Sequence, residues 1–305
     1  MADLTETRFQ GRITVIIVTY NSAHCVPALV TGLGGASKII VVDNASNDET
    51  VNLFRQALPR AEVIENKLNL GFGAANNLAL ALVTTPYALL LNPDCIPNEG
   101  FFAGLDEATA IFPDAAVIAP HLLRRDGEVE LSYRWSSSLW KSRGPQAVGP
   151  CSVGFVCGAA MLLNMSAMQT IGLFDESFFL YYEDEDLCQR IFMAKQSIVL
   201  IPNVEIVHLS RSSVKGRNPI KSEFQRGFHH AQSKLFFTLK YIGKRSANRQ
   251  RAKTLALAFL TLIPRLLLPH PRYLARLAGR ITGLVLSSHK LNKHNKSNDS
   301  LKRQG

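Results

Sequence analysis

The sequence predicts an α/β fold: a mostly parallel sheet flanked by helices, continued by a helical, basic C-terminal extension. Short apolar runs rich in β-branched residues alternate with segments of helical length, a pattern typical of parallel strands joined by right-handed crossovers. A hydrophobic content of 47% and a charged content of 19% describe a globular core. The net charge of +10 is unevenly divided, because residues 1–210 carry 13 Lys/Arg and 22 Asp/Glu, whereas residues 211–305 carry 21 Lys/Arg and two Asp/Glu. An acidic body with a basic extension indicates an anionic partner for the extension.

Four strands are expected in the first third of the chain, and the first two are expected to be buried. The segments that predict them are residues 13–18, 38–42, 61–65 and 87–91, with helices between them at 49–58 and 73–83. A polar cluster follows several of these runs, and open α/β sheets bind ligands at the carboxyl ends of their strands. The order of the elements therefore predicts a ligand site at the strand ends.

After Pro113 the pattern becomes less regular. Residues 122–148 are expected to form loops or hairpins over the sheet, residues 152–163 resume apolar structure, and residues 197–201 form a late strand. The chain is expected to be wholly helical from about residue 219. Five cysteines without a Cys-x-x-Cys pair favour a reduced, intracellular protein, and the polar N-terminus is not a secretory signal.

Four consecutive acidic residues, Glu183-Asp-Glu-Asp186, stand between an aromatic run and a helical segment at 187–195. Like charges packed this closely repel, so the cluster indicates a cation, a base to be tuned, or open solvent. A solvated acidic turn is the simpler interpretation. However, Asn92-Pro93-Asp94 and His208 each end an apolar run. Together with the acidic cluster they supply a metal-ligand pair and a candidate base.

Six motifs occur in a distinctive order along the chain. They are Val15-Ile-Ile-Val-Thr-Tyr-Asn21, Val41-Val-Asp-Asn-Ala-Ser46, Asn69-Leu-Gly-Phe-Gly-Ala-Ala-Asn76, Leu90-Leu-Asn-Pro-Asp94, Gly154-Phe-Val-Cys-Gly-Ala159, and Phe174-Asp-Glu-Ser-Phe-Phe followed by Glu183-Asp-Glu-Asp-Leu187. Jointly they resemble family 2 inverting glycosyltransferases of the GT-A fold, and within them the rhamnosyltransferase-like branch of bacterial cell-surface polysaccharide assembly. The resemblance covers residues 12–242.

The resemblance implies a division of the chain into domains. A GT-A catalytic domain would span 12–218, with a nucleotide-binding part at 12–112 and an acceptor part at 113–218. A flexible N-terminus, residues 1–11, would precede it. A helical, amphipathic, membrane-associating extension would follow at 219–286, and a disordered basic tail at 287–305.

The strand ends and the Gly-rich turn are implied to bind a nucleotide diphosphate sugar. An Asp can accept hydrogen bonds from a pyrimidine N–H and from ribose hydroxyls, which suits Asp43. Considered alone, residues 43–48 would be an Asx-turn and helix cap. The Gly-rich turn also resembles the dinucleotide-binding pattern Gly-x-Gly-x-x-Gly, but Asn76 occupies the position of the last glycine. This difference disfavours an NAD-dependent oxidoreductase. The implied donor-binding residues are Thr19, Tyr20, Asn21, Asp43, Asn44, Ser46, Asn69, Gly71, Phe72, Asn76, Asn92 and Asp94.

A divalent cation, Mn²⁺ or Mg²⁺, is the implied cofactor. Asn92-Pro93-Asp94 occupies the place of the family's Asp-x-Asp metal motif, so only Asp94 supplies a carboxylate there. His208 stands where some family members place a metal-binding His, and an imidazole suits Mn²⁺ better than Ca²⁺. A structural His after a strand is the alternative. Asn92 leaves open a weakly bound metal.

Asp184 aligns with the residue that is expected to act as general base, and Glu183 and Asp186 are the next candidates. A base must lie within hydrogen-bond reach of the acceptor hydroxyl, and crowding by like charges raises its pKa. Gly158 and Cys157 are implied to bind the acceptor, although close packing explains a glycine equally well. The implied reaction is a single displacement: the base takes the acceptor proton, the oxygen attacks the anomeric carbon, and the configuration inverts.

The basic extension has the pattern of helices that lie in a lipid headgroup layer. Its apolar stretch 255–268 is shorter than the roughly 20 residues that span a bilayer. Arg272, Arg276 and Arg280 form one helical stripe, and Leu274, Leu277, Ile281 and Leu284 line another face. Helices packed on the domain, or a homo-oligomer interface, are the alternatives. The apolar content disfavours a nucleic-acid partner.

The sequence therefore predicts an inverting glycosyltransferase that is cytoplasmic and peripheral on the inner face of the cytoplasmic membrane. The acceptor is expected to be a polyprenyl-diphosphate-linked glycan. Resemblance to the rhamnosyltransferase branch favours L-rhamnose from dTDP-rhamnose, while UDP-galactose or UDP-N-acetylglucosamine remain open. A non-catalytic sugar-nucleotide-binding scaffold subunit is the alternative from another class.

Overall fold

The structure is a computed structural model that describes residues 11–135, 145–209, 219–267 and 270–301. Part of the predicted loop region, residues 136–144, and nearly all of the predicted flexible N-terminus lie outside the described residues. The chain divides into two compact units. The first comprises Met1–Ser177 and Glu183–Lys215, and the second comprises Phe178–Tyr182 and Gly216–Gly305.

A ten-stranded sheet forms the centre of the first unit. Eight of its strands follow one another in the order β3-β2-β1-β4-β11-β6-β12-β5, and beside this path β7 pairs with β6 and β9 with β12. Its N-terminal half is parallel, as predicted: β1 (Ile13–Thr19), β2 (Lys38–Asp43), β3 (Glu62–Glu65) and β4 (Tyr87–Leu91). Thr19 pairs with Asp43 in the register of β1 and β2, so these two polar strand ends are neighbours. The mostly parallel sheet flanked by helices is confirmed.

The C-terminal half of the sheet contains a reversal that the sequence pattern does not predict. Strand β11 (Ala160–Asn164) runs antiparallel to both β4 and β6 (Val117–Leu123) and lies between them. Strand β12 (Ile198–His208) is parallel to β6, and β5 (Cys95–Pro97) is antiparallel to β12. The remaining short strands are β7 (Val129–Glu130), β8 (Tyr133–Arg134), β9 (Cys151–Ser152) and β10 (Phe155–Val156).

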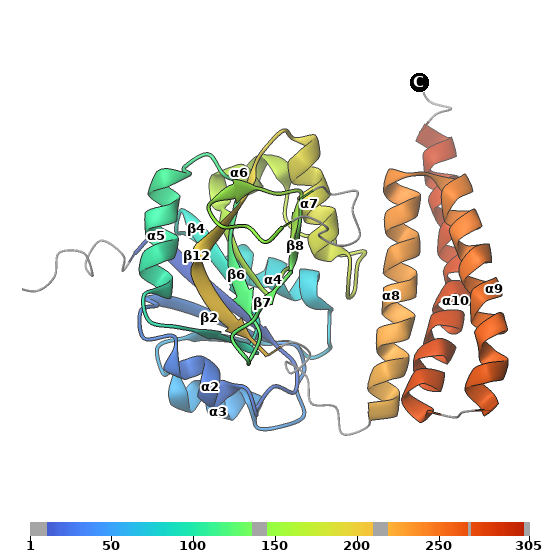
Figure 1. Cartoon of the computed structure of the whole chain (residues 1–305), viewed down its shortest axis with the longest axis horizontal. Helices are drawn as coiled ribbons and strands as arrows, with labels where there is room; N and C mark the ends of the chain where they lie inside the picture. The colour runs from blue at the N-terminus through green and yellow to red at the C-terminus, as the bar shows by residue number, and fades with distance from the viewer. Residues whose placement is uncertain (1–10, 136–144, 210–218, 268–269, 302–305) are drawn as a thin grey trace, which may run out of the picture. The chain divides into compact units, whose positions relative to one another are not determined.

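Helices cover both faces of the sheet (Figure 1). Residues of α2 (Val26–Thr31), α3 (Thr50–Ala57) and α5 (Phe101–Ile111) enter the core on one face. Residues of α4 (Phe72–Leu80), α6 (Met165–Ile171) and α7 (Glu183–Met193) enter the core on the other. Side chains of a strand alternate between faces, and β1 accordingly sends Val15 and Ile17 to the first core and Ile16 to the second.

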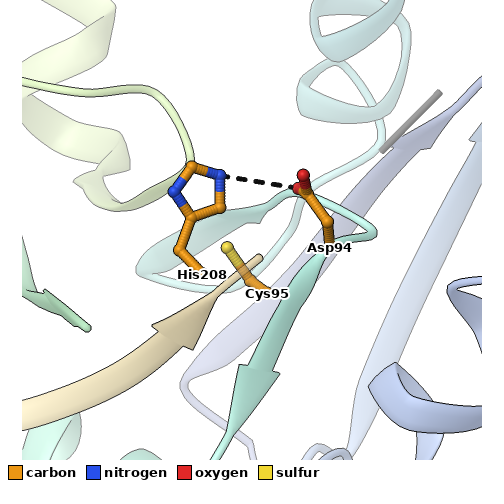
Figure 2. A group of neighbouring side chains, drawn as sticks. All are labelled: Asp94, Cys95 and His208. Atoms are coloured by element: carbon orange, nitrogen blue, oxygen red, sulfur yellow. Dashed lines mark ion pairs between the residues drawn. The ribbon is translucent and has the colours of Figure 1, made fainter. Parts of the chain in front are cut away.

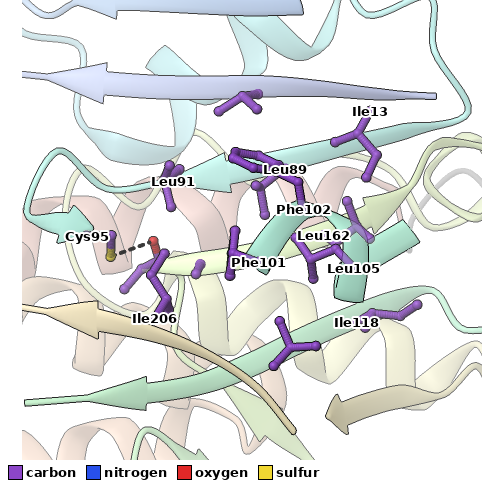
Figure 3. Packing of buried hydrophobic residues seen from close by; sticks show 14 of the residues in the cluster. Ile13, Leu89, Leu91, Cys95, Phe101, Phe102, Leu105, Ile118, Leu162 and Ile206 are labelled. Carbon is purple, nitrogen blue, oxygen red and sulfur yellow. Dashed lines mark hydrogen bonds between the residues drawn. The ribbon is translucent and has the colours of Figure 1, made fainter. Parts of the chain in front are cut away.

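Figure 3 shows the first core at close range, where Phe101, Phe102 and Leu105 of α5 pack with apolar side chains of the strands. Phe101 and Leu105 are fully buried. Burying an aromatic or aliphatic side chain of this size contributes about 1.5–3 kcal/mol, so this layer stabilises the strands that carry the polar ends.

The second unit consists of three long helices, α8 (Pro219–Tyr241), α9 (Lys244–Leu267) and α10 (Pro271–Leu301), which run side by side (Figure 1). Helices α8 and α10 approach closely at glycines, because a Cβ on Gly227 would lie 2.2 Å from the carbonyl oxygen of Arg276. A Cβ on Gly279 would lie 2.0 Å from that of Phe224. Among the described residues, no helix combines the length and apolar composition that crossing a bilayer requires.

Two details of this unit differ from the sequence-based expectations. Leu277 and Leu284, expected on a lipid-facing surface of α10, are buried, and Leu284 packs in a small core with Leu235 of α8. The neighbouring helices of the unit therefore cover this apolar face. Helix α10 also continues to Leu301, whereas a disordered tail is predicted from residue 287; no Gly or Pro interrupts that stretch.

The aromatic run that precedes the acidic cluster belongs to the second unit. Phe178 contacts Phe236 of α8 with ring centroids 4.9 Å apart, and Ser233 Oγ donates to the carbonyl oxygen of Leu180 at 2.9 Å. The next residues, Tyr181 and Tyr182, have φ angles of +67° and +70°, an unusual conformation for bulky side chains. The chain passes from this segment directly into the first turn of α7.

Candidate active site

Thr19 and Asp43, at the paired ends of β1 and β2, leave polar atoms for a ligand. Both residues are buried. Within the described residues, Thr19 Oγ1 and Asp43 Oδ1 have no hydrogen-bond partner. Asp43 Oδ2 accepts from the N–H of Ser46 at 2.9 Å. A buried polar atom without a partner is costly, so these two atoms at neighbouring strand ends are candidates for hydrogen bonds to a polar ligand.

The loops after β1 and β2 are bonded to each other around this pair. The Asn21 N–H donates to Ser46 Oγ at 2.8 Å, and the Asn47 N–H donates to Asn21 Oδ1 at 2.8 Å. Asn21 has a φ of +52°, a left-handed conformation that Asn tolerates better than most residues. Tyr20 lies beside them and is partly exposed. Burial chiefly raises the pKa of Asp43, while its bonds with Ser46 lower it.

The side chain of Asn44 holds the Gly-rich turn. Its Nδ2 donates to Asn69 Oδ1 at 3.0 Å and to the carbonyl oxygen of Gly71 at 3.1 Å, and its Oδ1 accepts from the N–H of Leu70 at 2.9 Å. These bonds give Asn44 and Asn69 a structural role in shaping the turn. Gly71 needs its φ of +89° to start α4, and buried Asn76 donates to the carbonyl oxygen of Phe72 at 2.9 Å.

Asp94 and His208 meet across the pairing of β5 and β12. Figure 2 shows the imidazole of His208 facing the carboxylate of Asp94, with Cys95 beside them. His208 Nε2 lies 3.6 Å from Asp94 Oδ1, and Nδ1 lies 2.8 Å from Oε2 of Glu130. Burial lowers the pKa of His208, but the hydrogen bonds and charges of Asp94 and Glu130 outweigh it and raise that pKa to about 9.

This donor set fits a divalent cation that prefers oxygen and nitrogen. Two ligand atoms 3.6 Å apart can both lie about 2.1 Å from one ion, because their separation is less than twice that length. Burial raises the pKa of the Cys95 thiol well above its ordinary value, and its Sγ–H donates to the carbonyl oxygen of Ala159 at 3.4 Å. Without a cation the thiol is therefore neutral. Asp94 and His208 offer the oxygen and nitrogen ligands that such a cation prefers, and they are the candidate ligand pair.

The acidic cluster forms the first turn of α7, where a helix N-terminus favours negative charge. Asp184 Oδ2 accepts from the N–H of Gly158 at 3.2 Å, and Oδ1 accepts from the N–H of Glu185 at 2.9 Å. Burial raises the pKa of Asp184, while the two N–H groups and the charge of Arg134 lower it. The carboxylate is thus fixed in place and held as a stronger base than an exposed Asp.

The other three acidic side chains have separate surroundings. Asp186 is fully buried, and its Oδ2 accepts from Arg190 Nε at 2.8 Å, while Arg190 also donates to the carbonyl oxygens of residues 171–173. Glu185 pairs with buried Arg134 at 3.3 Å. Glu183 is buried, and its Oε2 has no hydrogen-bond partner among the described residues. Burial, followed by the charge of Asp184, raises the pKa of Glu183 well above its ordinary value.

Gly158, Cys157 and Phe72 surround Asp184. A Cβ on Gly158 would lie 3.4 Å from the Phe72 ring and 3.5 Å from Cβ of Asp184, so this backbone is close to both. Phe72 in turn packs edge-on against Phe174, with centroids 6.1 Å apart. Burial raises the pKa of the Cys157 thiol, which stays neutral. The structure thus joins the Gly-rich turn and the acidic cluster in one place.

Two charged residues of the site are absent from the sequence-based prediction. Glu130 and Arg134 both lie in the irregular stretch 122–148, where periodicity carries no signal. Asp126-Gly127 is a hairpin turn signal that could have indicated strands on either side of it. Nothing in the sequence indicates which charge each strand would meet.

The chain thus has an α/β fold in which polar strand ends, an acidic helix start and a carboxylate–imidazole pair form the candidate site. The family model described as glycosyl transferase family 2 matches residues 14–172, more than half of the chain. The chain belongs to this family, and it is a glycosyltransferase with a GT-A-type fold.

Several similar proteins are named as glycosyltransferases, in agreement with this family assignment. The chain is 26% identical over 266 residues to the N-acetylglucosaminyl-diphospho-decaprenol L-rhamnosyltransferase of Mycobacterium tuberculosis, covering 76% of this chain and 85% of the relative. It is 24% identical over 262 residues to the rhamnosyltransferase WbbL of Escherichia coli K12, covering 76% and 93%. The solved mannosyltransferase PcManGT of Pyrobaculum calidifontis, in complex with GDP-Man and Mn²⁺, superposes with a TM-score of 0.55 at 17% identity, covering 91% and 87%.

Proposed function

We propose that this glycosyltransferase moves L-rhamnose from dTDP-rhamnose to a polyprenyl-diphosphate-linked glycan with inversion at the anomeric carbon. The observation that carries the catalytic part is the placement of Asp184, which is partly buried, accepts hydrogen bonds from two backbone N–H groups and lies beside Gly158. The names of the mycobacterial and E. coli relatives support the donor sugar and the lipid-linked acceptor.

In the proposed reaction Asp184 accepts the proton of the acceptor hydroxyl. The oxygen of that hydroxyl attacks the anomeric carbon at the same time. The bond to the nucleoside diphosphate breaks in the same step. Burial raises the pKa of Asp184, which favours proton transfer to it. Gly158 contributes its N–H to orient the carboxylate, and the acceptor would pass along the backbone at Cys157 and Gly158.

The donor would lie over the ends of β1 and β2. Thr19 Oγ1 and Asp43 Oδ1 would take up hydrogen bonds from the pyrimidine and ribose, since both atoms are buried without partners in the described part of the chain. Asn21 and Ser46, which are bonded to each other, would lie beside the donor, and Asn44 and Asn69 hold the turn at Gly71. Asp94 and His208 would hold Mn²⁺ or Mg²⁺, and Asn92 would offer its carbonyl oxygen. The cation would supply positive charge to the leaving diphosphate.

The helical unit would bring the enzyme to the inner face of the cytoplasmic membrane. On α9, Arg245, Arg249 and Lys253 are exposed and lead at helical spacing into the exposed side chains of Leu257 and Leu260. A cationic stretch that continues into an apolar one on a single face suits an anionic lipid surface. On α10 only part of the predicted Arg stripe is exposed: Arg272 is, whereas Arg276 lies 3.6 Å from Glu223.

Replacing Asp184 by Asn tests the catalytic part. Turnover of dTDP-rhamnose with membranes that contain the lipid-linked acceptor should fall about 10²–10⁴-fold, the usual contribution of a general base. Binding of dTDP, measured by thermal shift, should be retained. Glu107→Gln is the control, because Glu107 is exposed on α5. Unchanged turnover in Asp184→Asn would exclude Asp184 as the base, and a nucleotide-binding wild type without any turnover would favour a scaffold subunit.

A further inference from the structure

The sheet register brings Glu130 to His208. On β6, Leu122 is the partner of Glu130 on one side and of Ile206 on the other. His208 follows Ile206 by two residues, and strand side chains two apart project on the same face. Three adjacent strands therefore place Glu130 and His208 over one face, where Oε2 and Nδ1 lie 2.8 Å apart.

This contact determines which ring nitrogen of His208 keeps its hydrogen when the imidazole is in the neutral form that binds metals. The Glu130 carboxylate only accepts hydrogen bonds, so the hydrogen of that neutral ring is held on Nδ1. The lone pair of the neutral ring is then on Nε2. Nε2 is the nitrogen that lies 3.6 Å from Asp94 Oδ1. Rotation of the ring by half a turn would put a carbon where each nitrogen now lies, so it would break the bond to Glu130 and turn Nε2 away from Asp94.

We propose that Glu130 is a positioning residue of the metal site, which fixes the ring of His208 so that Nε2 and Asp94 Oδ1 converge on one cation. The inference rests on the proposed metal role of Asp94 and His208 and adds the residue that orients them. Carboxylates in this position, bonded to the far nitrogen of a ligand imidazole, typically contribute 10–100-fold to metal affinity.

The competing explanation is that Glu130 only ties the β6–β7 hairpin to β12. The Glu130 side chain is 30% exposed, and an ion pair at the edge of a sheet contributes little to stability. In that case replacing Glu130 would leave metal affinity unchanged. The two explanations therefore differ in metal binding, and this difference can be measured without turnover.

The test is Mn²⁺ binding to the full-length protein, followed by the electron paramagnetic resonance signal of free Mn²⁺ during titration with MnCl₂. Glu130→Ala should weaken binding about 10–100-fold. Glu130→Gln keeps the size of the side chain and an acceptor oxygen but loses the charge, so it should weaken binding less. Glu128→Gln is the matched control, since Glu128 is exposed on the same hairpin.

A double-mutant cycle shows whether Glu130 acts through His208. In a His208→Ala background the additional change Glu130→Ala should have no further effect on Mn²⁺ affinity, because the ring that it orients is gone. If circular dichroism shows that Glu130→Ala does not fold, the Mn²⁺ affinity of Glu130→Gln is compared with that of Glu128→Gln instead. Equal Mn²⁺ affinity in parent and Glu130 variants, or a parent that binds no Mn²⁺, would overturn the inference. Sugar transfer is assayed separately, so a parent that binds Mn²⁺ but transfers no sugar would contradict only the proposed function.

Discussion

Glu183→Gln should make the first unit more stable at neutral pH than the parent. Glu183 is 6% exposed, and its Oε2 has no hydrogen-bond partner among the described residues. Burial and the adjacent Asp184 raise its pKa well above the ordinary 4.5. Gln has the same size and carries no charge at any pH, so the substitution removes the titration while keeping the packing.

The upward shift of the Glu183 pKa determines whether the protein gains or loses stability as the pH rises. The folded state holds the proton of Glu183 over a pH range in which the unfolded state has released it. The stability from this group is therefore fully present below about pH 4.5 and is lost as the pH rises toward the folded pKa. Within that window the loss is about 1.4 kcal/mol per pH unit. The difference in unfolding free energy between Glu183→Gln and the parent should grow in favour of the variant at up to this rate.

Urea unfolding followed by tryptophan fluorescence at pH 5, 6 and 7 measures this difference. The two tryptophans of the sequence are at positions 135 and 140, and none occurs in the residues of the second unit, so the signal does not report the helices. Exposed Glu107→Gln provides the baseline. A difference between Glu183→Gln and parent that stays constant with pH would mean that Glu183 titrates normally, and the account of a desolvated acidic cluster would be wrong.

Two further predictions concern the helical unit. The double substitution Leu257→Asp and Leu260→Asp should reduce binding to vesicles that contain anionic lipid, measured by co-sedimentation. The control Ile111→Asp, at an exposed position of α5, should not reduce it. An equal loss of vesicle binding in both proteins would exclude α9 as the membrane-binding surface. Gly279→Ala should loosen the packing of α8 against α10, because its Cβ would lie 2.0 Å from the carbonyl oxygen of Phe224. Looser packing should appear as faster amide hydrogen exchange in α10. Gly34→Ala, where a Cβ meets nothing within 4 Å, is the control, and exchange that is equally slow in both variants would show that the helices shift at no cost.

The N-terminal half of the fold could be predicted because its signals are local. Strands β1, β2 and β4 are mostly apolar runs, and a polar segment follows each of them directly in the sequence. The same locality reveals the acidic cluster and Asp94. Residues that follow one another along a strand or helix need no knowledge of distant segments.

The remaining features depend on long-range pairing. The reversed strand β11 is an apolar run like any other, and nothing in its composition indicates an antiparallel place between β4 and β6. Glu130 reaches His208 only through the register of three strands, and Arg134 reaches Glu185 from a separate two-stranded sheet, β8 and β10. The apolar face of α10 is amphipathic by sequence, but amphipathicity does not distinguish lipid from the neighbouring helix that covers Leu284.

The anomeric configuration of the product tests the central claim most directly. The purified enzyme would be incubated with dTDP-rhamnose and a polyprenyl-diphosphate-linked acceptor, and the new linkage would be examined by NMR. A single displacement with Asp184 as base predicts a rhamnosylated lipid whose anomeric configuration is opposite to that of the donor. A product with the donor's configuration would contradict the single displacement, and no product with any nucleotide sugar would contradict the assignment as a transferase.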